Sequence, residues 1–185
     1  WESNTSRLSE KMIGIAVTDA RTATVVGTDG AIFSTTDGGN NWSPGRHGIR
    51  NFLRKICFTD AYTGTVVGFD GTIRRTVDGG ATWTQQESGT TEGLMDVTFM
   101  DEDIGTVVGD YGIILRTTDG GEHWTRQASG TASFLFSVSF TDANTGTAVG
   151  EYGTILHTTD GGENWVHQAS GTTEFLTDVF FIDAE

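Results

Sequence analysis

A gap-free repeat of 41 residues runs through almost the whole chain. Its clearest markers recur at that spacing and are Asp37, Asp78, Asp119 and Asp160, each followed five positions later by Trp42, Trp83, Trp124 and Trp165. Residues 94–134 match residues 135–175 at 25 of 41 positions, which indicates duplication. Periods of 20 to 50 residues are typical of solenoids, propellers and repeat arrays. The repeat therefore restricts the chain to these architectures.

Each repeat has the pattern of four short strands. In the third copy, apolar and polar residues alternate over 94–99, β-branched runs cover 105–109 and 113–117, and a last short segment covers 124–127. No window carries a helical period, which excludes helical solenoids. We therefore predict an all-β fold, a β-propeller of four-stranded antiparallel blades. The predicted blades are 12–47, 53–88, 94–129 and 135–170 of a single domain or propeller fragment, 1–185, with flanking strands at 1–6 and 176–181.

Composition agrees with this fold and excludes several partners. The chain has 26 glycines and one proline, as expected for many tight turns between short strands. Its 11 Lys and Arg against 25 Asp and Glu give a net charge of −14, which repels nucleic acids and anionic lipids. No stretch approaches 18 consecutive apolar residues. We expect no nucleic-acid partner and no membrane span.

One turn motif, Thr-x-Asp-x-Gly-x-x-Trp, recurs in every repeat. An Asp beside two glycines can accept backbone N–H bonds, while the glycines supply positive φ. The Trp is expected to pack against the next blade. Because identical repeated turns are folding devices and offer one carboxylate each, we predict a structural role, with neither catalysis nor calcium binding. The motif residues are Thr35, Asp37, Gly39, Trp42, Thr76, Asp78, Gly80, Trp83, Thr117, Asp119, Gly121, Trp124, Thr158, Asp160, Gly162 and Trp165.

This motif resembles the Asp-box, or BNR repeat, of sialidases, sortilin-type receptors and some glycoside hydrolases. The fuller repeat, "LMDVTF" followed by "GTVVGDYGIILRTTDGGEHWTRQASGT", resembles that of the photosystem II stability and assembly factors. The resemblance implies a propeller found in the photosynthetic lumen and in secreted bacterial proteins, with the boxes opposite the ligand-binding side. It also implies an extracellular, periplasmic or lumenal location. It says little about function, because one fold hosts many functions.

Candidate binding residues lie where the copies differ. The tips between the second and third strands carry Thr28-Asp29 in the first copy, and then Phe69, Asp70, Asp110, Tyr111, Glu151 and Tyr152. These aromatic and acidic side chains could contact a sugar or a protein loop, or they could cap the hydrophobic channel. Both interpretations stay open.

The second copy is basic in an acidic chain. Residues 43–84 contain three Asp against Arg46, Arg50, Arg54, Lys55, Arg74 and Arg75, a local charge of +3. Arg74 takes the place of the apolar residues Phe33, Leu115 and Leu156. One hypothesis is a basic patch that captures an acidic protein tail or a carboxylate; the other is pairing with acidic neighbours inside the protein.

Enzymatic function is not predicted. The only proline, Pro44, is not part of the Arg-Ile-Pro tripeptide usual in sialidases, and no signal selects the carboxylate pair that a glycoside hydrolase needs. No metal-ligand spacing links His47, His123, His157 and His167, and Cys57 stands in a core strand. We predict a non-catalytic scaffold that binds a protein partner and needs no cofactor or metal. The alternative is a carbohydrate-binding or glycosidase-like propeller with a glycan ligand.

The number of blades in the ring is left open. Four stacked blades would expose apolar faces at both ends. Three outcomes follow: a tight four-bladed ring, a fragment of a larger ring, or a homo-oligomer whose chains close the propeller. We favour self-association, because it covers the exposed faces.

Overall fold

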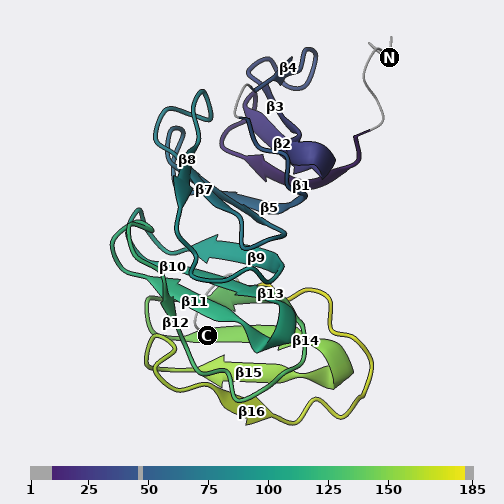
Figure 1. Cartoon of the computed structure of the whole chain (residues 1–185), viewed down its shortest axis with the longest axis vertical. Coiled ribbons are helices and arrows are strands. Elements are labelled where there is room, and N and C mark those ends of the chain that lie inside the picture. The colour runs from purple at the N-terminus through teal and green to yellow at the C-terminus, as the bar shows by residue number, and fades with distance from the viewer. Residues whose placement is uncertain (1–9, 46–47, 182–185) are drawn as a thin grey trace.

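In a computed structural model of the protein, residues 10–45 and 48–181 are described, and they form four β-sheets that follow one another in space (Figure 1). Each sheet is an antiparallel meander whose strands lie in sequence order. The fold is all-β, as predicted.

The strand bounds repeat from blade to blade. Blade 1 consists of β1 (Met12–Val17), β2 (Ala23–Gly27), β3 (Ile32–Thr35) and β4 (Ser43–Pro44). Blade 2 consists of β5 (Leu53–Phe58), β6 (Gly64–Gly68), β7 (Ile73–Thr76) and β8 (Thr84–Gln86). Blade 3 consists of β9 (Leu94–Phe99), β10 (Gly105–Gly109), β11 (Ile114–Thr117) and β12 (Thr125–Arg126). Blade 4 consists of β13 (Leu135–Phe140), β14 (Gly146–Gly150), β15 (Ile155–Thr158) and β16 (Val166–Gln168). Single 3-10 turns, η1 (Thr28–Gly30), η2 (Asp110–Gly112) and η3 (Glu151–Gly153), form three of the tips.

The hydrophobic core lies between the blades. Three buried clusters each join one face of a blade to the facing side of the next blade. Neighbouring blades contact one another through their first strands, β1 with β5, β5 with β9 and β9 with β13. At one repeat position of these strands, Leu53, Leu94 and Leu135 are all 0% exposed. A blade therefore buries its first strand only when another blade precedes it.

The motif tryptophans pack in the opposite direction to the one expected. Trp83 lies in a cluster with Val26 and Ile32 of blade 1, and Trp165 lies in a cluster with Val108 and Ile114 of blade 3. Each ring contacts the blade that precedes it in the chain, so the expectation of contact with the next blade was wrong. The reason is geometric: the fourth strand starts at the box, and its Trp faces the same side as the phenylalanine of the first strand, Phe140 in blade 4, with ring planes at 88°.

The four blades form an open arc. In the described part of the chain no contact comparable to those between successive blades joins β13 to β1. The first blade lies at the top of the view and the fourth at the bottom (Figure 1). Met12 and Ile15, which occupy positions that are buried in the other blades, are 38% and 59% exposed. The tight four-bladed ring, one of the three outcomes considered, is therefore not formed.

The flanking strand predicted at 176–181 is absent, and the one predicted at 1–6 lies outside the described residues. Residues 176–181 still run along blade 4. The Leu176 amide donates to the Gly150 carbonyl at the end of β14 (3.0 Å), and the Phe181 amide donates to the Ser139 hydroxyl of β13 (3.1 Å). A first strand forms its ladder with the second strand of its own blade. No such strand accompanies this segment among the described residues, so it docks without forming a ladder.

The described helices are all single 3-10 turns, and none is long and apolar enough to cross a membrane.

We predict that replacing Leu94 by Ala lowers the free energy of unfolding by about 2–5 kcal/mol, as for other fully buried leucines. The matched control is Met12→Ala at the same repeat position of blade 1, where exposure should limit the loss to about 1 kcal/mol or less. Urea denaturation followed by tryptophan fluorescence measures both. Equal losses in the two variants would contradict the blade-to-blade core described above.

Candidate functional site

The two edges of the blades differ in character. The tips between second and third strands lie along the right of Figure 1 with the segments that connect successive blades, whereas the box turns of blades 2, 3 and 4 lie along the left. We call the first edge, made of the tips, the connections 48–52, 87–93, 127–134 and 169–175, and the strand ends that adjoin them, the loop face. The resemblance to Asp-box propellers implied this separation of boxes from the ligand-binding side.

The box turns are saturated with internal hydrogen bonds. In blade 2, Asp78 Oδ1 accepts from the Thr76 hydroxyl (2.8 Å) and from the Thr82 amide (2.8 Å), while Oδ2 accepts from the Thr82 hydroxyl (2.6 Å). The hydroxyl of Thr76 also accepts from the Gly80 amide at 2.8 Å. The other three boxes repeat this network. The four carboxylates close their own turns, as the sequence predicts.

These hydrogen bonds stabilise the ionised carboxylates. The side chain of Asn41 lowers the pKa of Asp37 to about 2, the side chain of Thr82 does the same for Asp78, and the side chain of Asn164 for Asp160. The pKa of Asp119 is lowered mainly by the hydrogen bond from the His123 amide, and next by the hydrogen bond with the His123 ring. Carboxylates held in this way are poor proton donors near neutral pH.

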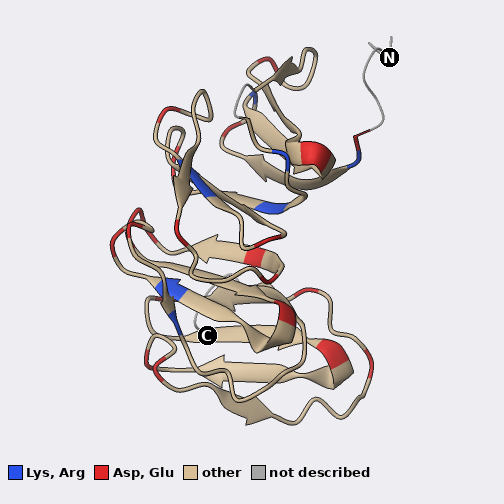
Figure 2. Cartoon of the chain, viewed as in Figure 1, with Lys and Arg blue, Asp and Glu red and all other residues tan. Residues whose placement is uncertain are grey.

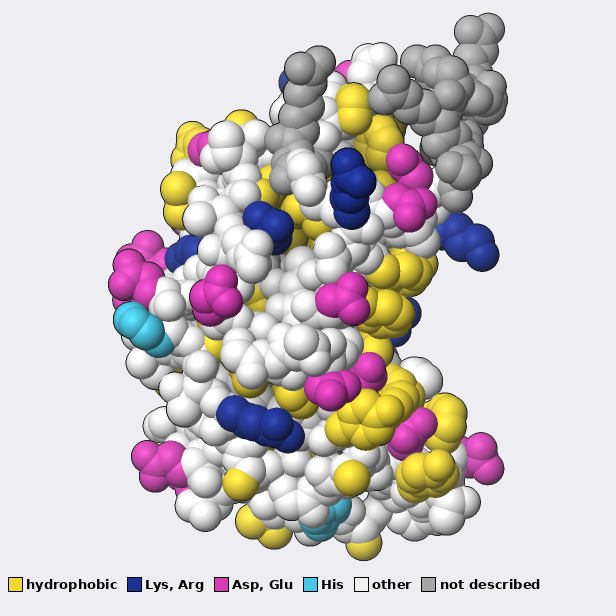
Figure 3. All heavy atoms as spheres, viewed as in Figure 1, with side chains coloured by type: hydrophobic (Ala, Val, Ile, Leu, Met, Phe, Trp, Pro, Cys, Tyr) yellow, Lys and Arg dark blue, Asp and Glu magenta, His cyan; other side chains and the backbone are white. Residues whose placement is uncertain are grey.

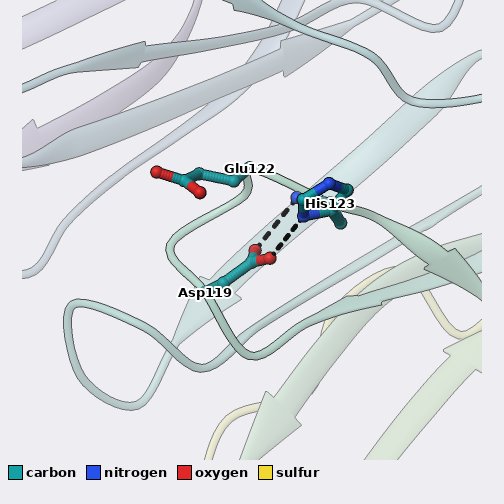
Figure 4. Close-up of side chains that lie close together, drawn as sticks. All are labelled: Asp119, Glu122 and His123. Carbon is teal, nitrogen blue, oxygen red and sulfur yellow. Dashed lines mark hydrogen bonds and ion pairs between the residues drawn. The ribbon is translucent and has the colours of Figure 1, made fainter.

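One box brings together three groups that could ligate a metal. The ligand atoms of Asp119, Glu122 and His123 lie within 4.8 Å of one another (Figure 4), a grouping that the sequence analysis did not foresee. His123 Nδ1 lies 2.7 Å from Asp119 Oδ2, the position that Asn41 Nδ2 and Asn164 Nδ2 take in other boxes. His123 therefore performs the same turn-closing task as those asparagines, and the structural interpretation accounts for the cluster.

The tips of the loop face are held rigidly. Their central residues adopt left-handed backbone angles, with φ of 53° to 56° at Asp29, Asp70, Tyr111 and Tyr152. A Cβ on the following Gly112 would lie 2.1 Å from the carbonyl oxygen of Thr131, so only glycine fits against the neighbouring loop. The amide of Glu151 donates to the Phe134 carbonyl at 2.9 Å. The tips therefore present their side chains from a fixed backbone.

Aromatic side chains line the loop face. Phe69 stacks on Phe52 with ring centroids 4.8 Å apart. Tyr111 packs edge-on against Phe134 at 5.0 Å, and Tyr152 packs against Phe175 at 6.1 Å. The tip rings remain 40–67% exposed. Figure 3 shows apolar groups mixed with acidic groups along this edge. The tip aromatics are thus packed against a phenylalanine on one side and open to solvent on the other.

Asp110 is the least satisfied carboxylate of the face. Its Oδ1 is buried and has no hydrogen-bond partner among the described residues. Burial raises the pKa of Asp110, and the nearby carboxylates of Glu92 and Glu151 act in the same direction. Its amide donates to the Gly93 carbonyl at 2.9 Å. Asp70, in contrast, accepts a hydrogen bond from Asn51 Nδ2 at 3.0 Å.

The basic residues of blade 2 do not form one patch (Figure 2). Lys55 forms an ion pair with buried Asp96 at 3.3 Å. Arg75 donates to the Glu102 carbonyl at 2.8 Å and lies over the Phe99 ring, so it binds blade 3. Arg74 pairs with Val66, a residue of the core between blades 1 and 2, and therefore faces blade 1. Three of the six predicted basic residues thus belong to blade interfaces, and of these Lys55 pairs with an acidic neighbour, as the internal-pairing hypothesis expected.

Two basic residues remain on the loop face. Arg50 is exposed in the connection that abuts the η1 tip, where its amide would lie 3.0 Å from a Cβ on Gly30. Arg54 occupies the bulge between Leu53 and Lys55 at the start of β5, and its charge acts on Asp110. Neither takes part in an ion pair closer than 4 Å within the described residues. Arg46 lies outside those residues.

Sequence reasoning missed the aromatic residues of the connections. Phe52, Phe134 and Phe175 share one repeat position, where blade 3 has Gly93, and each supports a tip side chain. Aligning the copies over the connections, and not only over the tips, would have revealed this column. The sequence pattern also did not predict the bulge at Arg54, because alternation of apolar and polar residues does not show which residue of a strand is the extra one.

The fold, the saturated boxes and the divergent loop face define a propeller of Asp-box blades. The sequence model of the family described as photosynthesis system II assembly factor YCF48 matches residues 45–126 and 86–173, which together span more than half of the chain. The chain belongs to this family.

Solved structures support the fold. A structure described as YCF48 bound to D1 peptide superposes with a TM-score of 0.74 at 18% identity, covering 94% of this chain and 57% of that one. YCF48 from Cyanidioschyzon merolae gives 0.71 at 21% identity, covering 94% and 60%. The GH74 enzyme of Niastella koreensis gives 0.71 at 16%, covering 86% and 30%. The chain thus spans under two thirds of these relatives. A search of curated proteins found no match.

We predict that His123 makes stability pH-dependent. The hydrogen bond to Asp119 and its charge raise the pKa of His123 above the usual 6.5. The stabilisation is therefore full below about pH 6.5 and is lost as the pH rises through the raised folded-state pKa. His123→Asn, which copies the other boxes, should remove this slope from urea midpoints taken between about pH 6 and 8. A slope that persists in the variant, or an NMR-titrated pKa at or below the usual value, would refute the assignment.

Proposed function

We propose that this protein is a non-catalytic scaffold that binds the acidic end of a protein partner on its loop face. The observation that carries the proposal is the pair Arg50 and Arg54, two cations on this face without an ion-pair partner among the described residues. Membership of the YCF48 assembly-factor family supports it. So does the superposition on a YCF48 structure that holds a D1 peptide.

Electrostatics favours a local mode of binding. A net charge of −14 repels an acidic partner at long range. Attraction must therefore come from groups in direct contact with it. A guanidinium can hold a carboxylate through two parallel hydrogen bonds, which suits Arg50 and Arg54 to a peptide terminus or an acidic side chain. Such binding should weaken with added salt, because the cations are near the surface.

The aromatic tips complete the proposed surface. Phe69 belongs to blade 2, as does Arg54, and Tyr111 belongs to blade 3, as does Asp110. Both aromatic side chains are exposed. Rigid aromatic rings supply contact area at little entropic cost, which is why they are enriched at protein interfaces. An extended peptide with acidic and apolar residues fits this combination of charge and rings.

We predict that Arg50→Glu combined with Arg54→Glu weakens binding of a D1 peptide at least about 30-fold, equivalent to about 2 kcal/mol or more for two lost charged contacts. Fluorescence anisotropy measures the dissociation constant. The matched control is Arg126→Glu, which reverses the charge of another exposed arginine, on the outer strand β12. Equal affinity in the double variant and the control would refute the arginine site, whereas unchanged unfolding curves show that the fold is intact.

The location and the assembly state extend this proposal. We place the protein outside the cytoplasm, in a lumenal, periplasmic or extracellular compartment, from its membership of the assembly-factor family. We propose that residues 1–185 form one propeller domain or part of one. The photosynthetic connection rests on the family and on the D1-bound relative. A second proposed partner is another copy of this chain, which would cover the apolar face of blade 1 that no blade covers among residues 10–45 and 48–181.

Glycan binding or hydrolysis is the second candidate function. One observation favours it: Asp110 has a raised pKa, to which the charge of Glu151 contributes, and its buried Oδ1 has no hydrogen-bond partner among the residues that the structure describes. A protonated acid beside an ionised carboxylate is the arrangement that glycoside hydrolases use. The GH74 neighbours share the fold, which by itself assigns no activity.

We expect no hydrolysis of aryl glycosides or xyloglucan by the wild-type protein. If turnover is found, Asp110→Asn should reduce it by about 100-fold or more if Asp110 is the general acid. Asp29→Asn at the blade 1 tip is the control, since it changes a carboxylate of the same face in an exposed position. Turnover abolished only by Asp110→Asn would replace the scaffold proposal with an enzymatic one.

A further inference from the structure

The first strand of every blade contains a bulge at its second residue. In blade 3, Leu94 and Asp96 pair with consecutive residues of β10, so Met95 between them is the extra residue. The register shifts at the same place in the other three blades. A bulge leaves its extra residue outside the ladder and redirects its side chain. This position differs in chemistry between the copies and is occupied by Ile13, Arg54, Met95 and Phe136.

The backbone of the bulge is fixed by the repeat. A glycine ends the second strand of each blade and lies opposite the bulge. A Cβ on Gly109 would lie 2.1 Å from the Gly93 carbonyl oxygen, and a Cβ on Gly68 would lie 2.1 Å from that of Phe52. Only glycine permits this close approach of two backbone segments. The repeat therefore holds the bulge in place, while the residue at the bulge is free to differ from blade to blade.

The bulge side chains are half-buried at the strand ends that belong to the loop face. Met95 and Phe136 are half-buried, whereas the residues on either side of each are buried. Arg54 is half-buried as well. Phe136 packs against Phe175 with ring centroids 5.8 Å apart. Blades 2, 3 and 4 thus present one cation followed by two apolar side chains, and we call Arg54, Met95 and Phe136 the bulge row.

The spacing of the bulge row matches an extended peptide. The strands β5, β9 and β13 follow one another (Figure 1), and Cα atoms of neighbouring first strands lie within 8 Å. Next to the bulge, Asp96 Oδ2 accepts from the Val138 amide at 3.0 Å, so one short side chain bridges β9 and β13. In an extended chain, residues i and i+2 lie about 6.6–6.8 Å apart on the same side. A peptide that crosses the first strands therefore places every second side chain over successive blades.

We propose that the bulge row selects an extended C-terminal peptide with apolar side chains at every second residue. Counting back from the last residue as position 0, the terminal carboxylate binds Arg54, the side chain at −2 lies on Met95, and the side chain at −4 lies on Phe136. The inference rests on the proposed function and specifies its partner. A guanidinium suits the carboxylate, and the two half-buried apolar residues suit apolar side chains.

Charges on the loop face set the direction of the peptide. Arg50 lies on the blade 1 side of Arg54, in the connection that abuts the η1 tip, so a carboxylate there meets two guanidinium groups. On the blade 3 and blade 4 side, the charges of Glu92 and Glu151 act on Asp110. These acidic groups repel a carboxylate, since juxtaposed like charges oppose binding. The terminus therefore lies over blade 2, and the peptide runs towards blade 4 and away from blade 1.

Fluorescence anisotropy with two labelled peptides of about eight residues tests the spacing. One has Val at −2 and −4 and the other has Val at −1 and −3, with Ser elsewhere, so composition and charge are equal. We expect the first to bind at least about tenfold more tightly, because only its apolar side chains reach the bulge row. Amidation of its terminus should weaken binding by at least about tenfold.

The outcomes separate this inference from the proposed function. Equal affinities for the two patterns, or no binding of either while a D1 peptide binds, would overturn the bulge row and leave the arginine site intact. If reversing the charges of Arg50 and Arg54 leaves binding of the D1 peptide unchanged, the arginine site fails, and this inference fails with it.

Variants of the bulge residues identify the surface. Met95→Ser combined with Phe136→Ser should bring the ratio of the two affinities from about tenfold to about one, while amidation still weakens binding. The matched control is Ile13→Ser, which changes the apolar bulge residue of blade 1, 42% exposed and outside the path of the peptide, and should leave the ratio unchanged. Partial unfolding lowers both affinities together, so the ratio reports the contact itself. A ratio that persists in the double variant, or that only Ile13→Ser abolishes, would overturn the proposal.

Discussion

The stacking of one blade on the next is the interaction on which the rest of this structure depends. A single four-stranded sheet has two faces and no core of its own, so its apolar side chains are buried only between neighbours. Leu53, Leu94 and Leu135 are buried for this reason, and Met12 at the same position is not. Within blade 3, Gly105 of β10 leaves room for the Phe99 ring of the adjoining strand β9, since a Cβ on Gly105 would lie 2.5 Å from that ring.

Stacking also decides which charges are available for function. Arg75 and Arg116 each lie over a phenylalanine of the following blade and donate to a carbonyl there, so these two cations stabilise junctions. Lys55 is drawn to the buried Asp96. On the edge that carries the box turns, the four box carboxylates accept hydrogen bonds within their own turns. What remains for recognition is the loop face, where backbone contacts hold the tips and the side chains are allowed to vary.

Much of the fold could be predicted because the same strand and turn patterns occur in four copies of the repeat. The strands at 94–99 and 105–109 were placed correctly, since alternation and β-branched runs mark them in each copy. The direction in which Trp83 packs was predicted wrongly, because a period does not say which neighbour a ring meets. The candidate site was predicted only in part: the tips were found, but the basic residues were grouped by sequence proximity, and adjacent strand residues such as Arg74 and Arg75 point to opposite faces.

The sequence by itself determined the blade, its box and the residues at its tips, because these are set by local periodicity and turn chemistry within 41 residues. Tertiary structure decided what those residues are free to do. It directed Arg75 and Lys55 into junctions and left Arg50 and Arg54 on the loop face. It also left Asp110 Oδ1 buried without a hydrogen-bond partner within the described part of the chain. It also decided that the arc is open. The physical reason is that side chains become buried or paired through contacts between blades. The residue pattern within one repeat does not determine those contacts.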